Sequence, residues 1–148
     1  MKLLIASDHA GFELKEALKD RAGTLGVSFN DLGTHSQDSV DYPDYAHALA
    51  REILKPGSGA SLGILICGSG VGVSIAANRH PGIRAVLAES PEIARLGREH
   101  NHANVLCLGA RFLSPDRAVE VIRAFLTATP ETGERHVRRV QKLGEPSK

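Results

Sequence analysis

The chain has 148 residues, and its 18 Lys and Arg residues nearly balance its 17 Asp and Glu residues, giving a formal net charge of +1. A general nucleic-acid-binding protein usually has a large basic excess, and two Tyr, four Phe and no Trp offer few surfaces on which bases can stack. These numbers exclude general nucleic-acid binding. They favour one domain, residues 1–148, with a buried core and a small-molecule ligand.

The two cysteines, Cys67 and Cys107, form neither a CxxC pair nor a Cys/His pattern with the spacing of a zinc site. The apolar run at residues 2–7 is too short for a signal peptide, and no window approaches the ~18 apolar residues of a membrane span. We therefore expect a cytoplasmic protein with reduced thiols and no membrane partner.

The first half of the chain predicts two strands, each followed by a helix. Residues 2–7 form a short apolar run that predicts a strand, and the apolar spacing after it predicts a helix that ends near Gly23. A weaker strand is predicted over residues 27–32. Asp41 is typical of a helix N-cap, and the helix that it begins ends at the Pro- and Gly-rich loop 56–59.

The second half of the chain alternates more clearly between strands and helices. A continuous apolar run at residues 62–67 predicts a strand that is buried on both faces, and a glycine-rich turn and a helix follow it. Two Ser-Pro pairs predict helix starts, because serine caps a helix and proline is favoured at its first position. The other predicted elements are strands at 83–88 and 104–108, helices that begin at Ser90 and Ser114, and a helical extension over about 130–148. This alternation predicts right-handed βαβ units on a parallel sheet of five strands.

Polar residues follow four of the predicted strands. They are Asp8 with His9, Cys67, Glu89 and Arg111. In an open parallel sheet, ligands bind outside the carboxyl ends of the strands. Several of these residues have an ordinary alternative role, Asp8 as a helix cap and Glu89 and Arg111 as surface charges. Their coincidence at one edge of the sheet favours a functional site there.

The turn from Gly68 to Gly72 (GSGVG) frees several backbone N–H groups beside the positive end of the next helix. Such a turn stabilises an anion, either a phosphate or an oxyanion that develops during a reaction. The alternative is a dinucleotide-binding module, whose fingerprint reads GxGxxG with an acidic residue ~20 positions later. Glu89 fits that spacing, but Val73 stands where the third glycine is required, so the fingerprint is broken.

Cys67 stands at the end of the central strand, immediately before this turn. A helix amino terminus stabilises the thiolate form of a nearby cysteine, which can then act as a base or a nucleophile. A buried core cysteine is the alternative, and Cys107, inside an apolar strand, is expected to be one.

Basic side chains in the last third of the chain are further candidates. His100 lies at i+7 from Ile93 and i+4 from Leu96, which predicts that it faces inward, either as a site residue or as a core histidine. Arg135 and Arg139 are spaced i, i+4 on the last predicted helix, so both guanidinium groups project from one face. That pair suits a terminal phosphate, and a solvated basic face is the alternative.

A series of short motifs resembles the ribose-5-phosphate isomerase B family, in the same order and from residue 1 to about 140. The motifs are Asp8-His9-Ala10-Gly11-Phe12, Asp41-Tyr42-Pro43-Asp44-Tyr45, Cys67-Gly68-Ser69-Gly70-Val71-Gly72 with Ala76-Ala77-Asn78, Gly82-Ile83-Arg84-Ala85, His100-Asn101 and Gly133-Glu134-Arg135-His136. The resemblance implies a Rossmann-like three-layer α/β/α sandwich. It also implies interconversion of D-ribose 5-phosphate and D-ribulose 5-phosphate through an enediolate, without a metal or an organic cofactor.

The resemblance implies a role for each matching residue. Cys67 is implied to move the proton between C2 and C1 of the open-chain sugar, and Ser69, where relatives commonly have Thr, to assist proton shifts between the two oxygens. His100, with Asp8, is implied to open the furanose ring. The substrate is implied to be held by the backbone of Gly68, Gly70, Val71 and Gly72 at the enediolate, by Tyr42 and Asn101 at the sugar hydroxyls, and by His9, Arg111, Arg135 and Arg139 at the phosphate.

The resemblance further implies a homodimer with shared active sites, or a tetramer, in which His100, Arg111 and the C-terminal arginines face the Cys67 of the partner chain. An isomerase of allose 6-phosphate or galactose 6-phosphate stays open as an alternative, as does a nucleotide-binding module that uses the Gly68–Gly72 turn. Galactose-6-phosphate isomerase subunits divide their catalytic groups between unlike chains. This chain has both Cys67 and the arginines, which favours the pentose phosphate.

Overall fold

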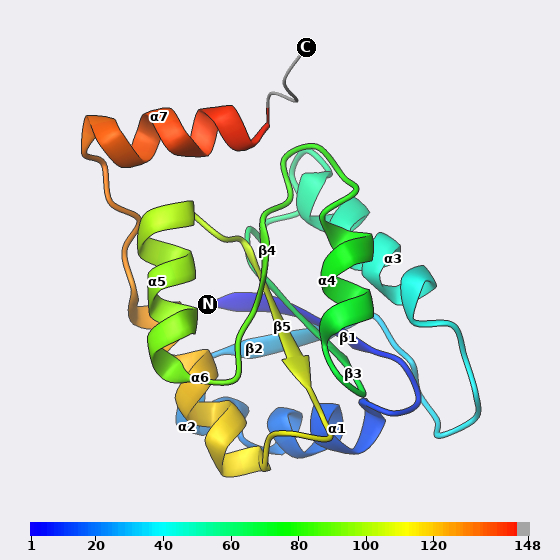
Figure 1. The fold of residues 1–148 in the computed structure, drawn as a ribbon. Helices are drawn as coiled ribbons and strands as arrows, with labels where there is room; N and C mark the ends of the chain where they lie inside the picture. The colour runs from blue at the N-terminus through cyan, green and yellow to red at the C-terminus, as the bar shows by residue number, and fades with distance from the viewer. Residues whose placement is uncertain (145–148) are drawn as a thin grey trace.

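The structure is a computed structural model that describes residues 1–144. Its centre is a parallel sheet of five strands in the order β2-β1-β3-β5-β4 (Figure 1). The strands are β1 (Lys2–Ser7), β2 (Ser28–Asp31), β3 (Gly63–Cys67), β4 (Ala85–Leu87) and β5 (Val105–Gly109). The helices are α1 (Phe12–Asp20), α2 (Ala22–Leu25), α3 (Tyr42–Leu54), α4 (Val71–Ala77), α5 (Pro91–Asn101), α6 (Pro115–Thr127) and α7 (Glu134–Leu143).

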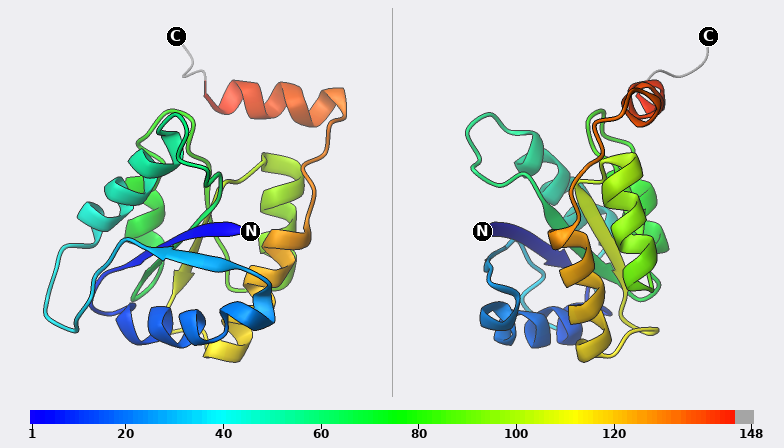
Figure 2. Two further views of the ribbon diagram at one scale, coloured as in Figure 1. Left: turned by 180° about the vertical axis from the view of Figure 1, so that it is seen from behind. Right: turned by 90° about the vertical axis from the view of Figure 1, so that its left-hand side faces the viewer.

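An apolar cluster on each face of the sheet holds the helices in place. Figure 2 shows the helices on both faces of the sheet. On one face, side chains of α3 and α4 such as Leu49 pack over Leu65 of β3. On the other face, side chains of α1, α5 and α6 such as Phe125 pack over Ile64 of β3. Successive residues of β3 thus point into opposite clusters, as expected for a strand that is buried on both sides. The predicted three-layer α/β/α sandwich with a five-stranded parallel sheet is confirmed.

Both predicted Ser-Pro helix starts are confirmed. The Ser90 hydroxyl accepts a hydrogen bond from the Ile93 backbone N–H across 3.3 Å, and the Ser114 hydroxyl accepts one from Arg117 across 3.2 Å. Each cap satisfies one of the N–H groups that a helix start leaves without an intrahelical partner. These caps fix where α5 and α6 begin.

Two predicted boundaries differ from the structure. The helix predicted to end near Gly23 ends at Asp20, because the chain turns at Arg21 and a separate short helix, α2, follows. The strand predicted over residues 83–88 pairs only over Ala85–Leu87. Its expected first residues, 83 and 84, precede the strand without regular structure, and the Asn104 side chain accepts the Arg84 backbone N–H across 2.8 Å.

The predicted C-terminal helical extension is found as α7, over Glu134–Leu143. Residues 145–148 of that prediction lie outside the described residues. No helix within residues 1–144 is long and apolar enough to cross a membrane.

The parallel arrangement gives the sheet a carboxyl edge, where the strands end, and an amino edge, where they begin. Each helix that follows a strand runs back toward the amino edge. α5 therefore starts near the carboxyl edge after β4 and ends at the amino edge, where α7 packs against it (Figure 1). With 11 residues, α5 is roughly 16 Å long. Residues at its two ends thus lie at different edges of the molecule.

A buried lysine joins α1 to β2. The Lys15 side chain is fully buried, and its Nζ donates to both carboxylate oxygens of Asp31 across 2.6 and 2.7 Å and to the Thr34 carbonyl across 2.7 Å. Lys19 Nζ also donates to Asp31, across 2.7 Å. Burial raises the pKa of Asp31, but the hydrogen bonds from Lys15 and Lys19 together lower it by more, so the pKa lies below its ordinary value. The Asp31 carboxylate therefore balances the positive charge of Lys15, which would otherwise be buried without a partner.

Candidate active site

The Cys67 side chain lies at the carboxyl edge, at the end of the central strand β3. Its residue is 4% exposed, and its Sγ accepts a hydrogen bond from the Gly70 backbone N–H across 3.1 Å. Gly70 has φ +76°, a left-handed conformation that brings this N–H back toward the strand end. The hydrogen bond from the turn therefore positions the sulfur at the end of β3.

The glycine-rich turn uses some of the N–H groups that the sequence predicts to be free. Gly70 donates to Cys67, and Val71 donates to the Ser69 hydroxyl across 3.3 Å. Gly72 lies in the first turn of α4, where a backbone N–H has no intrahelical acceptor. The anion-binding capacity of the turn therefore rests on fewer amides than expected, with the Ser69 hydroxyl directly beside them.

Asp8 and His9 follow β1 and meet the same edge. Asp8 is 6% exposed, and its Oδ1 accepts the Gly11 backbone N–H across 3.0 Å, but Gly11 itself is the N-cap of α1 and this helix start has no side-chain cap. His9 Nδ1 lies 3.2 Å from both the carbonyl and the N–H of Val40, so it ties the loop before α3 to the end of β1. Both side chains thus have fixed positions beside the turn.

Tyr42 and Arg111 pack directly on glycines of the turn. A Cβ atom built on Gly72 would lie 2.6 Å from the Tyr42 ring, and one on Gly68 would lie 3.1 Å from the Arg111 guanidinium carbon. Only glycine allows these two approaches without a shift of the neighbouring side chain. The Arg111 guanidinium consequently lies over the Gly68 of its own chain. This differs from the expectation that Arg111 faces the Cys67 of a partner.

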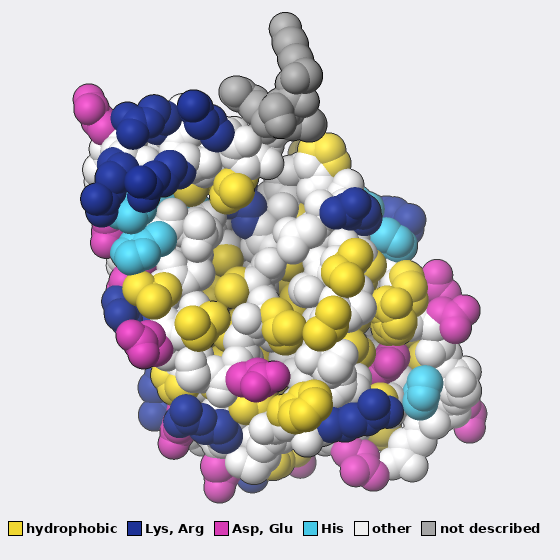
Figure 3. Space-filling model, in the orientation of Figure 1, with side chains coloured by type: hydrophobic (Ala, Val, Ile, Leu, Met, Phe, Trp, Pro, Cys, Tyr) yellow, Lys and Arg dark blue, Asp and Glu magenta, His cyan; other side chains and the backbone are white. Residues whose placement is uncertain are grey.

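The remaining predicted residues are not brought together with Cys67 in the chain. His100 and Asn101 end α5 at the amino edge, and Arg135 and Arg139 are exposed on α7 beside it. Figure 3 shows Lys and Arg side chains gathered over α7, with histidines next to them. The predicted site therefore divides into a carboxyl-edge group around Cys67 and an amino-edge group around His100.

The expectation that His100 faces inward with Ile93 and Leu96 is wrong. The buried residues of α5 are Ala94 and Gly97, and the His100 side chain is 40% exposed. Gly97 lets the helix approach the sheet, because a Cβ there would lie 2.9 Å from Val86. The face of α5 that contains Ile93 and Leu96 is thus not the face that packs on the sheet, which contains Ala94 and Gly97.

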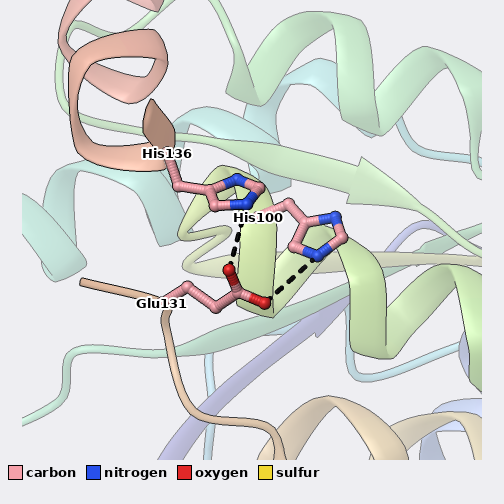
Figure 4. Close-up of side chains that lie close together, drawn as sticks. All are labelled: His100, Glu131 and His136. Carbon is pink, nitrogen blue, oxygen red and sulfur yellow. Dashed lines mark ion pairs between the residues drawn. The ribbon is translucent and has the colours of Figure 1, made fainter. Parts of the chain in front are cut away.

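Two residues that the sequence left without a role lie next to His100. The His136 ring stacks on the His100 ring with centroids 4.5 Å apart, and the Glu131 carboxylate lies between the two Nε2 atoms (Figure 4). Glu131 Oε1 is 3.4 Å from His100 and Oε2 is 3.0 Å from His136. His136 belongs to the sequence motif that contains Arg135, whereas no motif includes Glu131.

Cys107 is the core cysteine that the sequence predicts. It is fully buried in β5 among the residues that pack under α3 and α4. Burial raises the pKa of the Cys107 thiol far above its ordinary value, with a smaller contribution from Cys67. Cys107 is therefore a neutral thiol, whereas the Cys67 sulfur contacts the glycine-rich turn.

The family of the chain follows from its whole length rather than from one motif. A sequence model described as Ribose/Galactose Isomerase matches residues 3–143. The chain belongs to the ribose/galactose isomerase family. Ribose-5-phosphate isomerase B of Escherichia coli is 42% identical over 142 residues, which cover 96% of this chain and 93% of that relative.

Solved structures of this family share the fold. A ribose 5-phosphate isomerase from Thermotoga maritima is 48% identical, with a TM-score of 0.92 and 98% of each chain covered. Ribose-5-phosphate isomerase B from Clostridium thermocellum is 43% identical, with a TM-score of 0.91, covering 98% of this chain and 96% of that one. The sandwich and the placement of its elements are thus those of the ribose/galactose isomerase family.

Proposed function

We propose that this chain isomerises D-ribose 5-phosphate and D-ribulose 5-phosphate. The observation that carries the proposal is a buried cysteine, Cys67, which accepts a hydrogen bond from a glycine-rich turn in a full-length member of the ribose/galactose isomerase family. An aldose–ketose isomerase needs one base that removes a proton from one carbon and returns it to the next. It also needs donors that stabilise the enediolate formed in between. The turn and Cys67 supply both at one edge of the sheet.

The carboxyl-edge group performs the proton transfer. Cys67 takes the C2 proton of the open-chain aldose and returns it to C1, so that the aldehyde becomes a hydroxyl and the C2 hydroxyl becomes a ketone. The Ser69 hydroxyl moves protons between the two oxygens, and the Gly72 N–H faces the developing negative charge. Tyr42 is 40% exposed beside Gly72, where it can meet a sugar hydroxyl. Asp8, His9 and Arg111 complete this edge.

The amino-edge group performs ring opening and holds the phosphate. His100 transfers the proton that opens the furanose, and Asn101 binds a sugar hydroxyl. Arg135 and Arg139, one helical turn apart and both exposed, bind the phosphate with charge-assisted hydrogen bonds.

A homodimer brings the carboxyl-edge group of one chain close to the amino-edge group of the other. Each chain holds them at opposite edges, so a two-fold arrangement that sets the carboxyl edge of one chain against the amino edge of the other completes two equivalent sites. Because Arg111 lies over the turn of its own chain, it belongs to the carboxyl-edge group in this arrangement.

The substrate is a phosphorylated sugar, and we also propose that the enzyme acts in the cytoplasm, where such metabolites are retained by their charge.

Kinetics on the purified protein test the substrate. We expect kcat/KM for ribose 5-phosphate to exceed that for allose 6-phosphate and galactose 6-phosphate. A clear preference for either hexose phosphate would move the substrate class to six carbons.

Thermal unfolding with NAD and with ribose 5-phosphate tests the nucleotide-binding alternative, because a ligand that binds the folded state raises the unfolding temperature. Stabilisation by NAD alone would contradict the proposal.

A further inference from the structure

We propose that His100, Glu131 and His136 form a site for a single Zn²⁺ ion, and that zinc bound there inhibits the enzyme. The three side chains each offer one ligand atom, and these atoms lie within 4.8 Å of one another. Two imidazole nitrogens and a carboxylate oxygen are a ligand set of zinc enzymes that keep a fourth position open. The chain contributes them from three segments, α5, the loop before α7, and α7, so no sequence spacing predicts the site.

The separations of the ligand atoms fit a metal. Ligands at about 2.0–2.2 Å from a tetrahedral zinc ion lie roughly 3.4 Å from each other. The Glu131 carboxylate oxygens are 3.4 Å from His100 Nε2 and 3.0 Å from His136 Nε2. Both imidazoles thus present Nε2 to the same carboxylate (Figure 4). The two rings are stacked at an interplanar angle of 19°, and the three ligand atoms lie within 4.8 Å of one another, so one imidazole must turn out of the stack for all three to bind one ion.

The Glu131 backbone is held on both sides, which gives the carboxylate a defined place. Its N–H donates to the Glu99 carbonyl across 2.9 Å, and its carbonyl accepts a hydrogen bond from the His102 ring across 2.8 Å. Both partners belong to the carboxyl end of α5, where the helix dipole favours a cation. The loop before α7 is therefore fixed to the one helix end that also carries His100.

Exposure gives the ion a path to the site. His136 is 8% exposed and forms the inner wall, whereas the side chains of His100 and Glu131 are 40% and 46% exposed. The competing cation is Arg135, whose Nη2 lies 3.3 Å from His136 Nε2. Arg135 is exposed at the start of α7, so its guanidinium can swing into solvent when zinc binds.

Inhibition rests on the role of His100 in the proposed function. A His100 nitrogen that ligates zinc has no lone pair left for proton transfer, so ring opening stops. Displacement of Arg135 removes a phosphate ligand at the same time. Zinc is thus expected to inhibit reversibly, with a chelator restoring activity.

Binding is measured first and without reference to activity, by titrating the full chain with Zn²⁺ in competition with a chromophoric chelator. We expect one site per chain in the wild type and in Cys67→Ala, because the three proposed ligands are His100, Glu131 and His136 alone. Loss of a group that only orients a ligand already weakens metal binding by about 10–100-fold, so Glu131→Gln and His136→Gln should weaken it at least tenfold. Glu134→Gln, which removes a carboxylate from α7 outside the cluster, is the matched control and should not change affinity.

Two results overturn the site. One is wild-type affinity in Glu131→Gln, which remains decisive even if His136→Gln, a change at a buried residue, fails to fold. The other is a strong near-ultraviolet sulfur-to-cobalt band after titration with Co²⁺, which would place the metal on a cysteine. The expected Co²⁺ spectrum has only the weaker visible bands of nitrogen and oxygen ligands.

Activity assays then separate this inference from the proposed function. Zn²⁺ should reduce turnover of ribose 5-phosphate in the wild type, and Glu131→Gln should need at least tenfold more Zn²⁺ for the same fractional loss. Unchanged turnover at saturating Zn²⁺ overturns the inhibitory role. Absence of ribose 5-phosphate turnover in the metal-free wild type contradicts the proposed function and leaves the binding result standing.

Discussion

The Gly70 backbone N–H donates a hydrogen bond to Cys67 Sγ across 3.1 Å, linking the end of the central strand to the start of α4. The bond depends on the left-handed backbone of Gly70, because only that conformation returns the chain toward the strand end. A position three residues after the cysteine therefore sets the surroundings of the sulfur.

Gly70→Ala should destabilise the protein and impair the site together. A Cβ there would lie 2.5 Å from Leu87 Cδ1 and 2.9 Å from the backbone carbon of Leu108, and φ is +76°. A side chain forced into such a conformation costs about 1–3 kcal/mol, before any cost of the contacts. Urea unfolding and kcat are the measurements. Gly23→Ala, where a Cβ meets nothing within 4 Å inside α2, is the control and should leave stability unchanged or slightly raised.

Cys67→Ala should abolish isomerisation while ribose 5-phosphate still binds. Removal of a general base lowers turnover by about 10²–10⁴-fold. The groups that hold the phosphate and hydroxyls stay in place, so calorimetric affinity should change little. Cys107→Ala removes a buried neutral thiol instead, and it should lower stability without a comparable loss of kcat per folded molecule. Near-wild-type turnover in Cys67→Ala would mean that another group is the base.

Complementation tests the shared active site. Cys67→Ala and His100→Ala should each be inactive alone. In a mixed dimer, the His100→Ala chain supplies Cys67 and the Cys67→Ala chain supplies His100, so one of the two sites is intact. Random exchange of subunits should thus restore about a quarter of the wild-type activity. Mixing that restores nothing, although light scattering or native mass spectrometry detects mixed dimers, would show that each chain supplies its own site.

The carboxyl-edge group could be predicted from sequence because its positions follow from topology. Asp8 and Cys67 end parallel strands, and parallel strands end at one edge. The glycine-rich turn made the same prediction independently. The N-caps of α5 and α6 were likewise local, since a serine hydroxyl reaches an N–H only three residues away.

The amino-edge group could not be placed in the same way. His100 lies at the end of a helix whose buried positions are Ala94 and Gly97, small residues that carry little apolar signal. The larger apolar residues Ile93 and Leu96 therefore predicted the wrong buried face of α5. Glu131 lies in a loop whose position depends on hydrogen bonds to Glu99 and His102, far away along the chain. Contacts of that kind arise only from tertiary packing, and a pairing with a second chain is one step further from the sequence.

Asp31→Asn should destabilise the protein strongly at neutral pH and much less in acid. It removes the carboxylate 2.6 Å from the fully buried Lys15 ammonium and leaves only the more distant Glu16, at 3.5 Å, and breaking a buried ion pair costs about 3–5 kcal/mol. Because the folded pKa of Asp31 lies below its ordinary value of ~3.9, its contribution is complete above about pH 5 and is lost as the pH falls through the folded pKa.

The measurement for Asp31→Asn is the free energy of unfolding in urea at pH 7 and near pH 3. The difference from the wild type should shrink at the lower pH, because the Asp31 carboxylate takes up a proton more readily in the unfolded chain than in the folded protein. Glu16→Gln is the matched control. Its side chain is 41% exposed, although it also contacts Lys15 and Lys19, and an exposed pair contributes only about 0–1 kcal/mol. An equal loss in both variants would mean that the burial of Asp31 adds nothing to stability, and that the Lys15 side chain of α1 is held in place by the Thr34 carbonyl instead.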